Sequence, residues 1–302
     1  MDQLVAASLA GNINTVKALL LHATPPDVMQ TDKDGNTALL QACRNGHTVI
    51  VGMLVERVDD KHIEQTWRTV MLAEDDGSMG RMWSYRHPHI LGMLFPHVDD
   101  SVAMHVDVRN RTALIYASMI GATKSAEMLL ERATYEHVTH ADDGGFTALS
   151  HASRNGHTEI VEMLLDHIAK CGEQHVRSNV MHARSHGVNA IIDASEWGHV
   201  DILKTLLGRV TDEDVMQHDT DGNTALIRAS INGHSNVVDI LLPRITVNHV
   251  LHEKSGKNAI AFALEGEKRV HEKHGYGGYT NPYSDIAKAL TSCKDAKKPR
   301  LV

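Results

Sequence analysis

Histidine is the residue type that first suggests chemistry in this 302-residue sequence, which contains 22 of them. Three of these, His105, His140 and His182, lie at one equivalent place in successive segments of a repeated pattern. Zinc holds imidazole nitrogens at about 2 Å, whereas neighbouring helical layers lie roughly 8–10 Å apart, so equivalent positions cannot converge on one ion. We therefore expect structural or solvated histidines, with a pH-responsive surface as the alternative, and no metal or other cofactor.

Two short segments bear a partial likeness to catalytic or nucleotide-binding motifs. His271-Glu272-Lys273-His274 has one residue too few between Glu and the second His for the zinc-protease helix. Gly275-Tyr276-Gly277-Gly278 has no preceding strand and no following Lys-Ser or Lys-Thr, so it fits neither a dinucleotide fingerprint nor a phosphate loop. The sequence also has no Gly-x-Ser-x-Gly elbow. We expect a protein that is not an enzyme.

The elements that would position any site come from a repeated pattern of turn, helix, turn and helix. It reads DKDGNTALLQACRNGHTVIVGMLV at 32–55, DDGGFTALSHASRNGHTEIVEMLL at 142–165 and DTDGNTALIRASINGHSNVVDILL at 219–242. A Thr or Asn that can cap the first helix anchors each segment. These anchors are Thr37, Thr69, Thr112, Thr147, Asn189, Thr224 and Asn258. Their spacing of 32 to 43 residues predicts stacked helix-turn-helix units.

The pattern resembles the ankyrin repeat, whose signature is Thr-Pro-Leu-His-x-Ala in a period of about 33 residues. Here the Pro slot holds Ala, as at Ala38 and Ala148, and the His slot holds other residues, such as Leu40 and Ser150. The His of that signature hydrogen-bonds between units in the family, so the resemblance implies that apolar packing replaces it here. It also implies an all-α ankyrin-repeat solenoid, with units joined by β-hairpin-like turns, that binds a protein or peptide partner in its concave groove.

The repeat count predicts a solenoid over residues 1–292 and a basic C-terminal tail over 293–302. The eight units are 1–31 (N-cap), 32–63, 64–106 (degenerate), 107–141, 142–183, 184–218, 219–252 and 253–292 (C-cap). Insertions break the period near 74–88, 169–179 and 267–283. The first is expected between two helices, the second in the turn leading into the next unit. Each is either a functional decoration or a solvated loop.

Slots that the fold does not fix lie four, three and one residues before each anchor, and seven and eight after it. They are polar at the N-terminal end and become apolar in the middle of the chain, where Trp and Arg are typical of interface hot spots. The predicted partner-binding residues are Arg44, Arg111, Met119, Ile120, Phe146, Arg154, Val188, Trp197 and Ile231. The alternative is that Phe146 and Trp197 fold back against neighbouring helices.

Composition limits the classes of partner and the cellular compartments that we expect. The net charge of −8 disfavours nucleic acid, and no apolar run approaches the roughly 20 residues of a membrane span. Cys43, Cys171 and Cys293 lie far apart, which favours reduced thiols in the cytoplasm. The Lys297–Arg300 cluster leaves a nuclear location open. We expect a monomeric binding module or scaffold; a host-directed effector of a pathogen or symbiont, and a structural spacer, are the alternatives.

Overall fold

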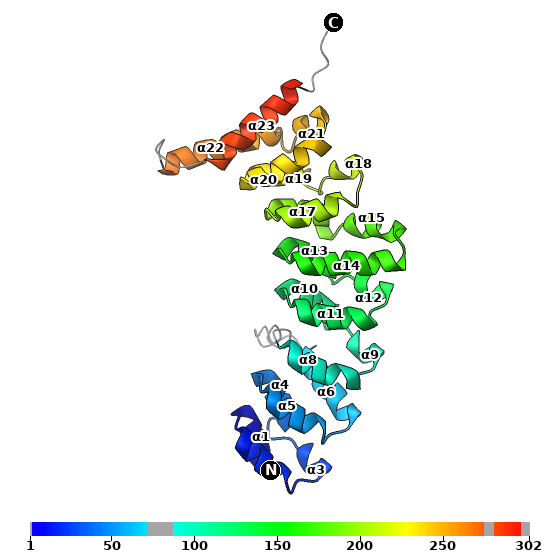
Figure 1. The fold of residues 1–302 in the computed structure, drawn as a ribbon. Coiled ribbons are helices and arrows are strands. Elements are labelled where there is room, and N and C mark those ends of the chain that lie inside the picture. The colour runs from blue at the N-terminus through cyan, green and yellow to red at the C-terminus, as the bar shows by residue number, and fades with distance from the viewer. Residues whose placement is uncertain (1, 72–86, 275–280, 297–302) are drawn as a thin grey trace. The chain divides into compact units, whose positions relative to one another are not determined.

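The computed structural model describes residues 2–71, 87–274 and 281–296, which fold into paired antiparallel helices (Figure 1). The chain divides into two compact units, 1–143 and 144–302. In each unit the helices form two rows: first helices pack on first helices, and second helices pack on second helices. Short helices and hairpin turns join the repeats.

The described residues of the N-terminal unit form four helix pairs. Its first-row helices are α1 (Asp2–Leu9), α4 (Ala38–Asn45), α6 (Asp60–Met71) and α10 (Ala113–Ile120). Its second-row helices are α2 (Ile13–Leu20), α5 (Thr48–Val55), α8 (Pro88–Leu94) and α11 (Thr123–Arg132). The connecting helices are α3 (Pro25–Val28), η1 (Phe95–His97), α9 (Asp100–Ala103) and α12 (Tyr135–Thr139). In the first row α1 packs on α4, and α4 on α6.

The C-terminal unit repeats this arrangement with longer helices at its end. Its first row is α13 (Ala148–Asn155), α16 (Ala190–Glu196), α19 (Ala225–Asn232) and α22 (Ala259–His274). Its second row is α14 (Thr158–Cys171), α17 (Val200–Leu207), α20 (Ser235–Leu241) and α23 (Pro282–Ala296). The connecting helices are α15 (Gln174–Val180), η2 (Ser185–Gly187), α18 (Asp212–Val215), η3 (Leu242–Arg244) and α21 (Val247–Leu251). In the first row α13 packs on α16, α16 on α19 and α19 on α22.

Six of the seven anchors cap a first-row helix as predicted. The Thr37 hydroxyl accepts from the Leu40 amide at 3.1 Å, and the Asn189 side chain accepts from Ile192 at 3.0 Å. Thr112, Thr147, Thr224 and Asn258 make the same bond. A cap of this kind contributes about 1 kcal/mol to helix stability. The caps therefore fix where each first-row helix begins.

The anchor predicted at Thr69 is wrong. Thr69 lies inside α6, and its hydroxyl donates to the Gln65 carbonyl at 2.8 Å. No Gly or Pro interrupts residues 60–71, so one helix runs through the place where other repeats have a hairpin. The α6 helix buries Trp67 completely against Phe95, with ring centroids 5.7 Å apart. The third repeat is degenerate in this sense.

Two of the predicted insertions lengthen helices. The extra residues expected in a turn at 169–179 instead extend α14 to Cys171 and form most of α15, so the expected lengthened turn is wrong. Glu267 belongs to α22, and Tyr283 to α23. In Figure 1 these two helices extend past the neighbouring α19 and α20. Trp83, Tyr85, Gly275–Gly278 and the Lys297–Arg300 cluster lie outside the described residues.

Candidate functional site

Side chains seven and eight residues after the anchors face the surface at the C-terminal ends of the first-row helices. In the N-terminal unit Arg44 is exposed, while Met119 and Ile120 are half-buried. In the C-terminal unit Trp197 is exposed, and Arg154 and Ile231 are half-buried. These slots can therefore reach a partner without disturbing the core.

The slot one residue before the anchor faces inward, so the predicted exposure of Val188 is wrong. Its side chain is only 3% exposed. In the next repeat Asn223 holds the same place, and its amide donates to both oxygens of Asp219, at 3.0 and 2.7 Å. Arg111 at this slot directs its Nε to the Asp142 carboxylate at 3.3 Å. Side chains here pack against the base of the hairpin.

Trp197 is the C-cap residue that directly follows α16, and 49% of its surface is exposed. The guanidinium of Arg154, from the preceding repeat, lies over the indole with 5.3 Å between its carbon and the ring centroid. The same guanidinium lies 5.9 Å from the Phe146 centroid. Cation–π contacts of this kind hold a planar guanidinium in one orientation. We call Phe146, Arg154, Trp197 and Ile231 the Trp197 surface.

Phe146 is half-buried and packs beneath the exposed side chains of this surface, against other residues of the protein. Its ring stacks on His151, with centroids 4.6 Å apart and an interplanar angle of 20°. The Arg184 guanidinium lies 4.4 Å from its centroid. The alternative that Phe146 packs on its neighbours therefore holds, and Trp197 is the aromatic side chain that a partner could cover.

A buried ion pair between Arg184 and Asp193 lies next to Phe146. Asp193 is 0% exposed, and Arg184 donates to its two oxygens at 3.2 and 2.9 Å. In the next repeat the two charges exchange places: the hairpin carries the acid, Asp219, and the helix carries the base, Arg228, 2.5 Å apart. Burial by itself would raise the pKa of Asp219, but hydrogen bonds from Arg228 and Asn223 outweigh it and hold that pKa below its ordinary value.

The hairpins explain how Arg184 is accommodated. An Asp in the turn normally accepts backbone N–H groups two and four residues ahead, as Asp107 does from Arg109 and Arg111. The Arg184 side chain cannot accept hydrogen bonds, and its hairpin instead uses positive φ at both His186 and Gly187, of 68° and 75°. The Arg184 side chain is thereby left for Phe146 and Asp193.

Histidines of the Gly-His pairs link successive repeats. The Nε2 atoms of His47, His199 and His234 lie 3.1, 3.0 and 2.9 Å from the carbonyl oxygens of Leu9, Arg154 and Glu196. A carbonyl only accepts, so each Nε2 carries the proton. The expectation that apolar packing takes over this role is corrected, because a different histidine makes the bond between repeats. Two of these bonds fix the helix ends that carry Arg154 and Trp197.

A second set of histidines links successive hairpins. The Nε2 of His140 lies 2.8 Å from the Asn110 carbonyl oxygen, and that of His182 lies 3.2 Å from Gly145. His252 makes the same contact with Gly222 at 3.1 Å. The structural interpretation is confirmed for His140 and His182. Among the described residues no three His, Cys, Asp or Glu side chains lie close enough to hold a metal ion.

The comparison with known families agrees with this geometry. A family model described as ankyrin repeats (3 copies) matches residues 4–78, 84–179, 141–216 and 191–272. The chain belongs to the ankyrin-repeat family. Proteins with ankyrin repeats generally serve as protein–protein interaction modules, and the family is typically non-catalytic. Within the part of the ankyrin-repeat chain that the structure describes, no helix is long and apolar enough to cross a membrane.

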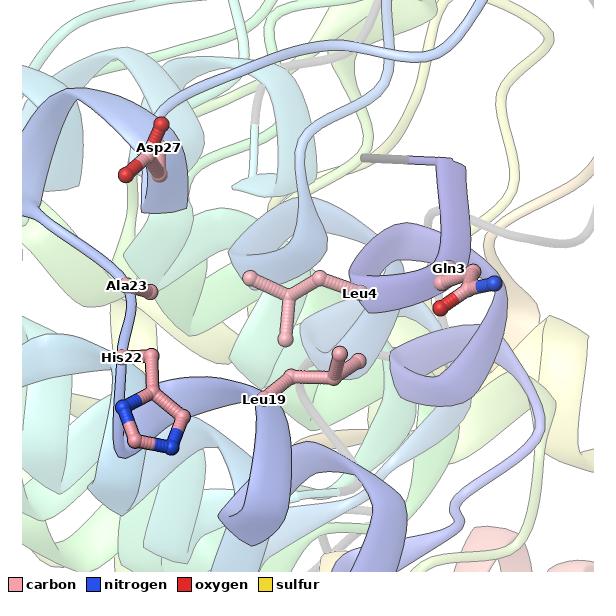
Figure 2. A pocket seen from close by; sticks show the side chains of 6 residues that line it. All are labelled: Gln3, Leu4, Leu19, His22, Ala23 and Asp27. Carbon is pink, nitrogen blue, oxygen red and sulfur yellow. The ribbon is translucent and has the colours of Figure 1, made fainter.

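The ankyrin stack also has an open pocket of about 200 Å³ where α1, α2 and α3 meet. Figure 2 shows Leu4 and Leu19 close together in it, with His22, Ala23 and Asp27 along one side of this pair and Gln3 on the other. The Asp27 carboxylate caps α3 by accepting from the amide and hydroxyl of Thr24, at 2.9 and 2.6 Å. Because the Asp27 carboxylate already accepts hydrogen bonds from Thr24, the pocket is a weaker candidate for a binding site than the Trp197 surface.

Proposed function

We propose that this ankyrin-repeat protein is a non-catalytic binding module or scaffold. It recognises a protein or peptide partner through the first-row helix ends, with the Trp197 surface at the centre. The observation that carries this proposal is the 49% exposure of Trp197 at a slot where three other repeats hold Asn45, Asn155 and Asn232. The fold accepts Asn there, so it does not require the indole.

Three features of this surface support the proposal. Trp and Arg are over-represented in interface hot spots, and Trp197 and Arg154 are in contact. The hydrogen bonds of His199 and His234 hold the backbone carbonyls of Arg154 and Glu196, and the guanidinium lies over the indole, so the backbone under these two side chains is already ordered before binding. The half-buried Ile231 lies near the end of α19, which packs on α16, and so adds an apolar side chain in the next repeat.

The cytoplasm is the compartment that we propose. Cys43, Cys171 and Cys293 are all free thiols, and Cys43 is buried in the core. Burial raises the pKa of the Cys43 thiol well above its ordinary value, which keeps it protonated and unreactive. Free thiols are typical of proteins in reducing compartments.

Quantitative affinity capture with the full chain and with Trp197→Asn tests the proposal. Leu251→Asn is the matched control, because Leu251 is another exposed apolar side chain of the same unit, at 40%. We expect the captured partner to bind at least about tenfold more weakly to Trp197→Asn and equally to Leu251→Asn, because loss of a hot-spot Trp costs about 2 kcal/mol. Circular dichroism should show that both variants remain folded.

Equal capture of the same proteins by the full chain and by Trp197→Asn would contradict the proposal. Loss of capture by both variants would contradict it as well, because a general effect of exposed apolar side chains would then explain the result. The single Trp197 substitution is preferred to a double substitution with Phe146, because Phe146 packs on His151 and Arg184.

A further inference from the structure

We propose that the partner presents an acidic side chain to Arg154 and an apolar side chain to Trp197. This inference rests on the proposed function and adds the chemistry of the ligand. It depends on how the charged groups around the Trp197 surface are already paired. Those groups are Arg154, Arg184, Asp193, Glu196, Arg228 and Asp219.

Two of the three arginines already donate close hydrogen bonds to carboxylates of the protein. Arg184 is 11% exposed at its side chain and donates to both oxygens of Asp193. Arg228 donates to Glu196 at 3.3 Å and to Asp219 at 2.5 Å. Each of the three carboxylates of this group therefore accepts a hydrogen bond from one of these two arginines, and Arg154 is the arginine without a close carboxylate.

Arg154 is the exception. Its side chain is 35% exposed. Of the carboxylate oxygens that the structure describes, the nearest is one of Asp193, which lies 3.8 Å from a guanidinium nitrogen and already accepts a hydrogen bond from Arg184. Among the described residues its guanidinium makes no hydrogen bond, although it lies over the Trp197 and Phe146 rings. A guanidinium has five N–H donors in a planar fork that matches a carboxylate. Arg154 is thus oriented for an acceptor that the described part of the chain does not supply.

The geometry also sets the spacing of the two ligand side chains. The Arg154 guanidinium and the Trp197 ring are 5.3 Å apart, and the exposed indole offers apolar area beside the charge. In an extended peptide, residues i and i+2 share one face and lie about 7 Å apart. In a helix, residues i and i+4 lie about 6 Å apart. An acidic and an apolar residue at either spacing would contact Arg154 and Trp197 together.

Other anionic partners fit less well. A nucleic acid backbone or an anionic membrane is bound through several clustered basic residues, because each contact neutralises one phosphate. The Trp197 surface has one exposed guanidinium, that of Arg154, without a hydrogen bond to the described residues, in a protein of net charge −8. A single carboxylate on a peptide matches that number.

Selection from a random twelve-residue peptide library, displayed on phage and applied to the full chain, identifies the ligand. We expect enriched peptides to share an Asp or Glu two or four residues from a large apolar residue. Affinities of a synthetic enriched peptide, and of its Asp→Asn or Glu→Gln version, are then measured by fluorescence polarisation. They are compared for the full chain, Arg154→Met and Trp197→Asn. Met is compatible with the fold at this slot because Met119 occupies it in another repeat.

We expect Arg154→Met to weaken binding about tenfold and to remove the preference for the acidic peptide over its amide version. Arg209→Met is the matched control and should change neither, because Arg209 is equally exposed, at 34%, and equally loosely paired, 3.9 Å from Asp166 and 3.7 Å from Glu173. In the full chain the amide version should bind about tenfold more weakly, and binding of the acidic peptide should weaken as salt rises.

The outcomes separate the two proposals. Enriched peptides that need Trp197 but lack acidic residues, or that bind Arg154→Met unchanged, overturn the acidic-ligand inference and leave the binding surface standing. Peptides that bind Trp197→Asn unchanged, or a library that yields no enriched peptide, overturn the proposed function and this inference with it.

Discussion

Replacing Arg184 by Ala should lower the free energy of unfolding by about 3–5 kcal/mol, because it leaves a buried carboxylate without its partner. Asp193 is 0% exposed and accepts from Arg184 at 3.2 and 2.9 Å. Charged hydrogen bonds contribute about 1.5–3 kcal/mol each. Arg184 also lies 4.4 Å from the Phe146 centroid, a contact of about 1 kcal/mol. Arg154 offsets part of the loss, since it is 3.8 Å from the same carboxylate.

A double-mutant cycle with Asp193→Ala measures the pair itself. The Arg184 side chain is 11% exposed, so Asp193→Ala should cost less, about 2–3 kcal/mol. The double variant should be more stable than the sum of the single losses predicts, with a coupling energy of about 2–3 kcal/mol. Urea denaturation followed by circular dichroism and tryptophan fluorescence provides the free energies. Additive losses, or an Arg184→Ala variant within about 1 kcal/mol of the natural protein, would refute the reasoning.

Two further predictions concern the same unit. Hydrogen bonds from Arg177 lower the pKa of Asp214 from 3.8 to about 2, so its stabilising effect is complete above about pH 4 and is lost as the pH falls towards 2. The gap in urea midpoint between the natural protein and Asp214→Asn should therefore be constant from pH 7 to 5 and shrink below pH 4; a constant gap down to pH 2 would contradict this. Gly198→Ala should lower the melting temperature by several degrees, because Gly198 has a φ of 76° and a Cβ there would lie 2.7 Å from the Nδ1 of His234. Calorimetry that finds no change would show that His234 moves aside freely.

Much of the fold could be predicted from the sequence because caps and turns are local. A Thr or Asn anchor and a Gly two residues earlier specify a helix start and a hairpin from a few adjacent residues. Thr69 has the residue type and the spacing of an anchor, but these two features alone do not specify a helix start. The stretch Asp60–Met71 lacks the Asp and Gly of the hairpin, and that absence was the available signal for one continuous helix.

The candidate site was less predictable, because exposure depends on which repeat a side chain contacts. Trp197 and Arg154 were named from their slots, and the structure leaves both accessible to solvent. Val188 was named by the same logic and is buried, because the slot before the anchor points at the hairpin base. The reversed pair of Arg184 and Asp193 could have been found by aligning the repeats with one another, since Asp219 and Arg228 show the opposite order. The contact between Arg184 and the Phe146 ring joins two different repeats, so aligning the repeats does not reveal it.

The end of the stack uses a different side chain for the same connection. Tyr283 donates its hydroxyl to the Ile231 carbonyl at 3.2 Å and lies over Gly233, as His234 does with Glu196 and Gly198. Four contacts between repeats, at Gly11, Gly156, Gly198 and Gly233, therefore share one arrangement, in which a ring lies over the glycine and bonds to a carbonyl at a helix end; the ring is His in three of them and Tyr in the fourth. Excising one whole repeat would bring Tyr283 over Gly198 with its chemistry unchanged. Such interchangeable contacts allow the number of repeats in a gene to grow or shrink without a new interface having to evolve.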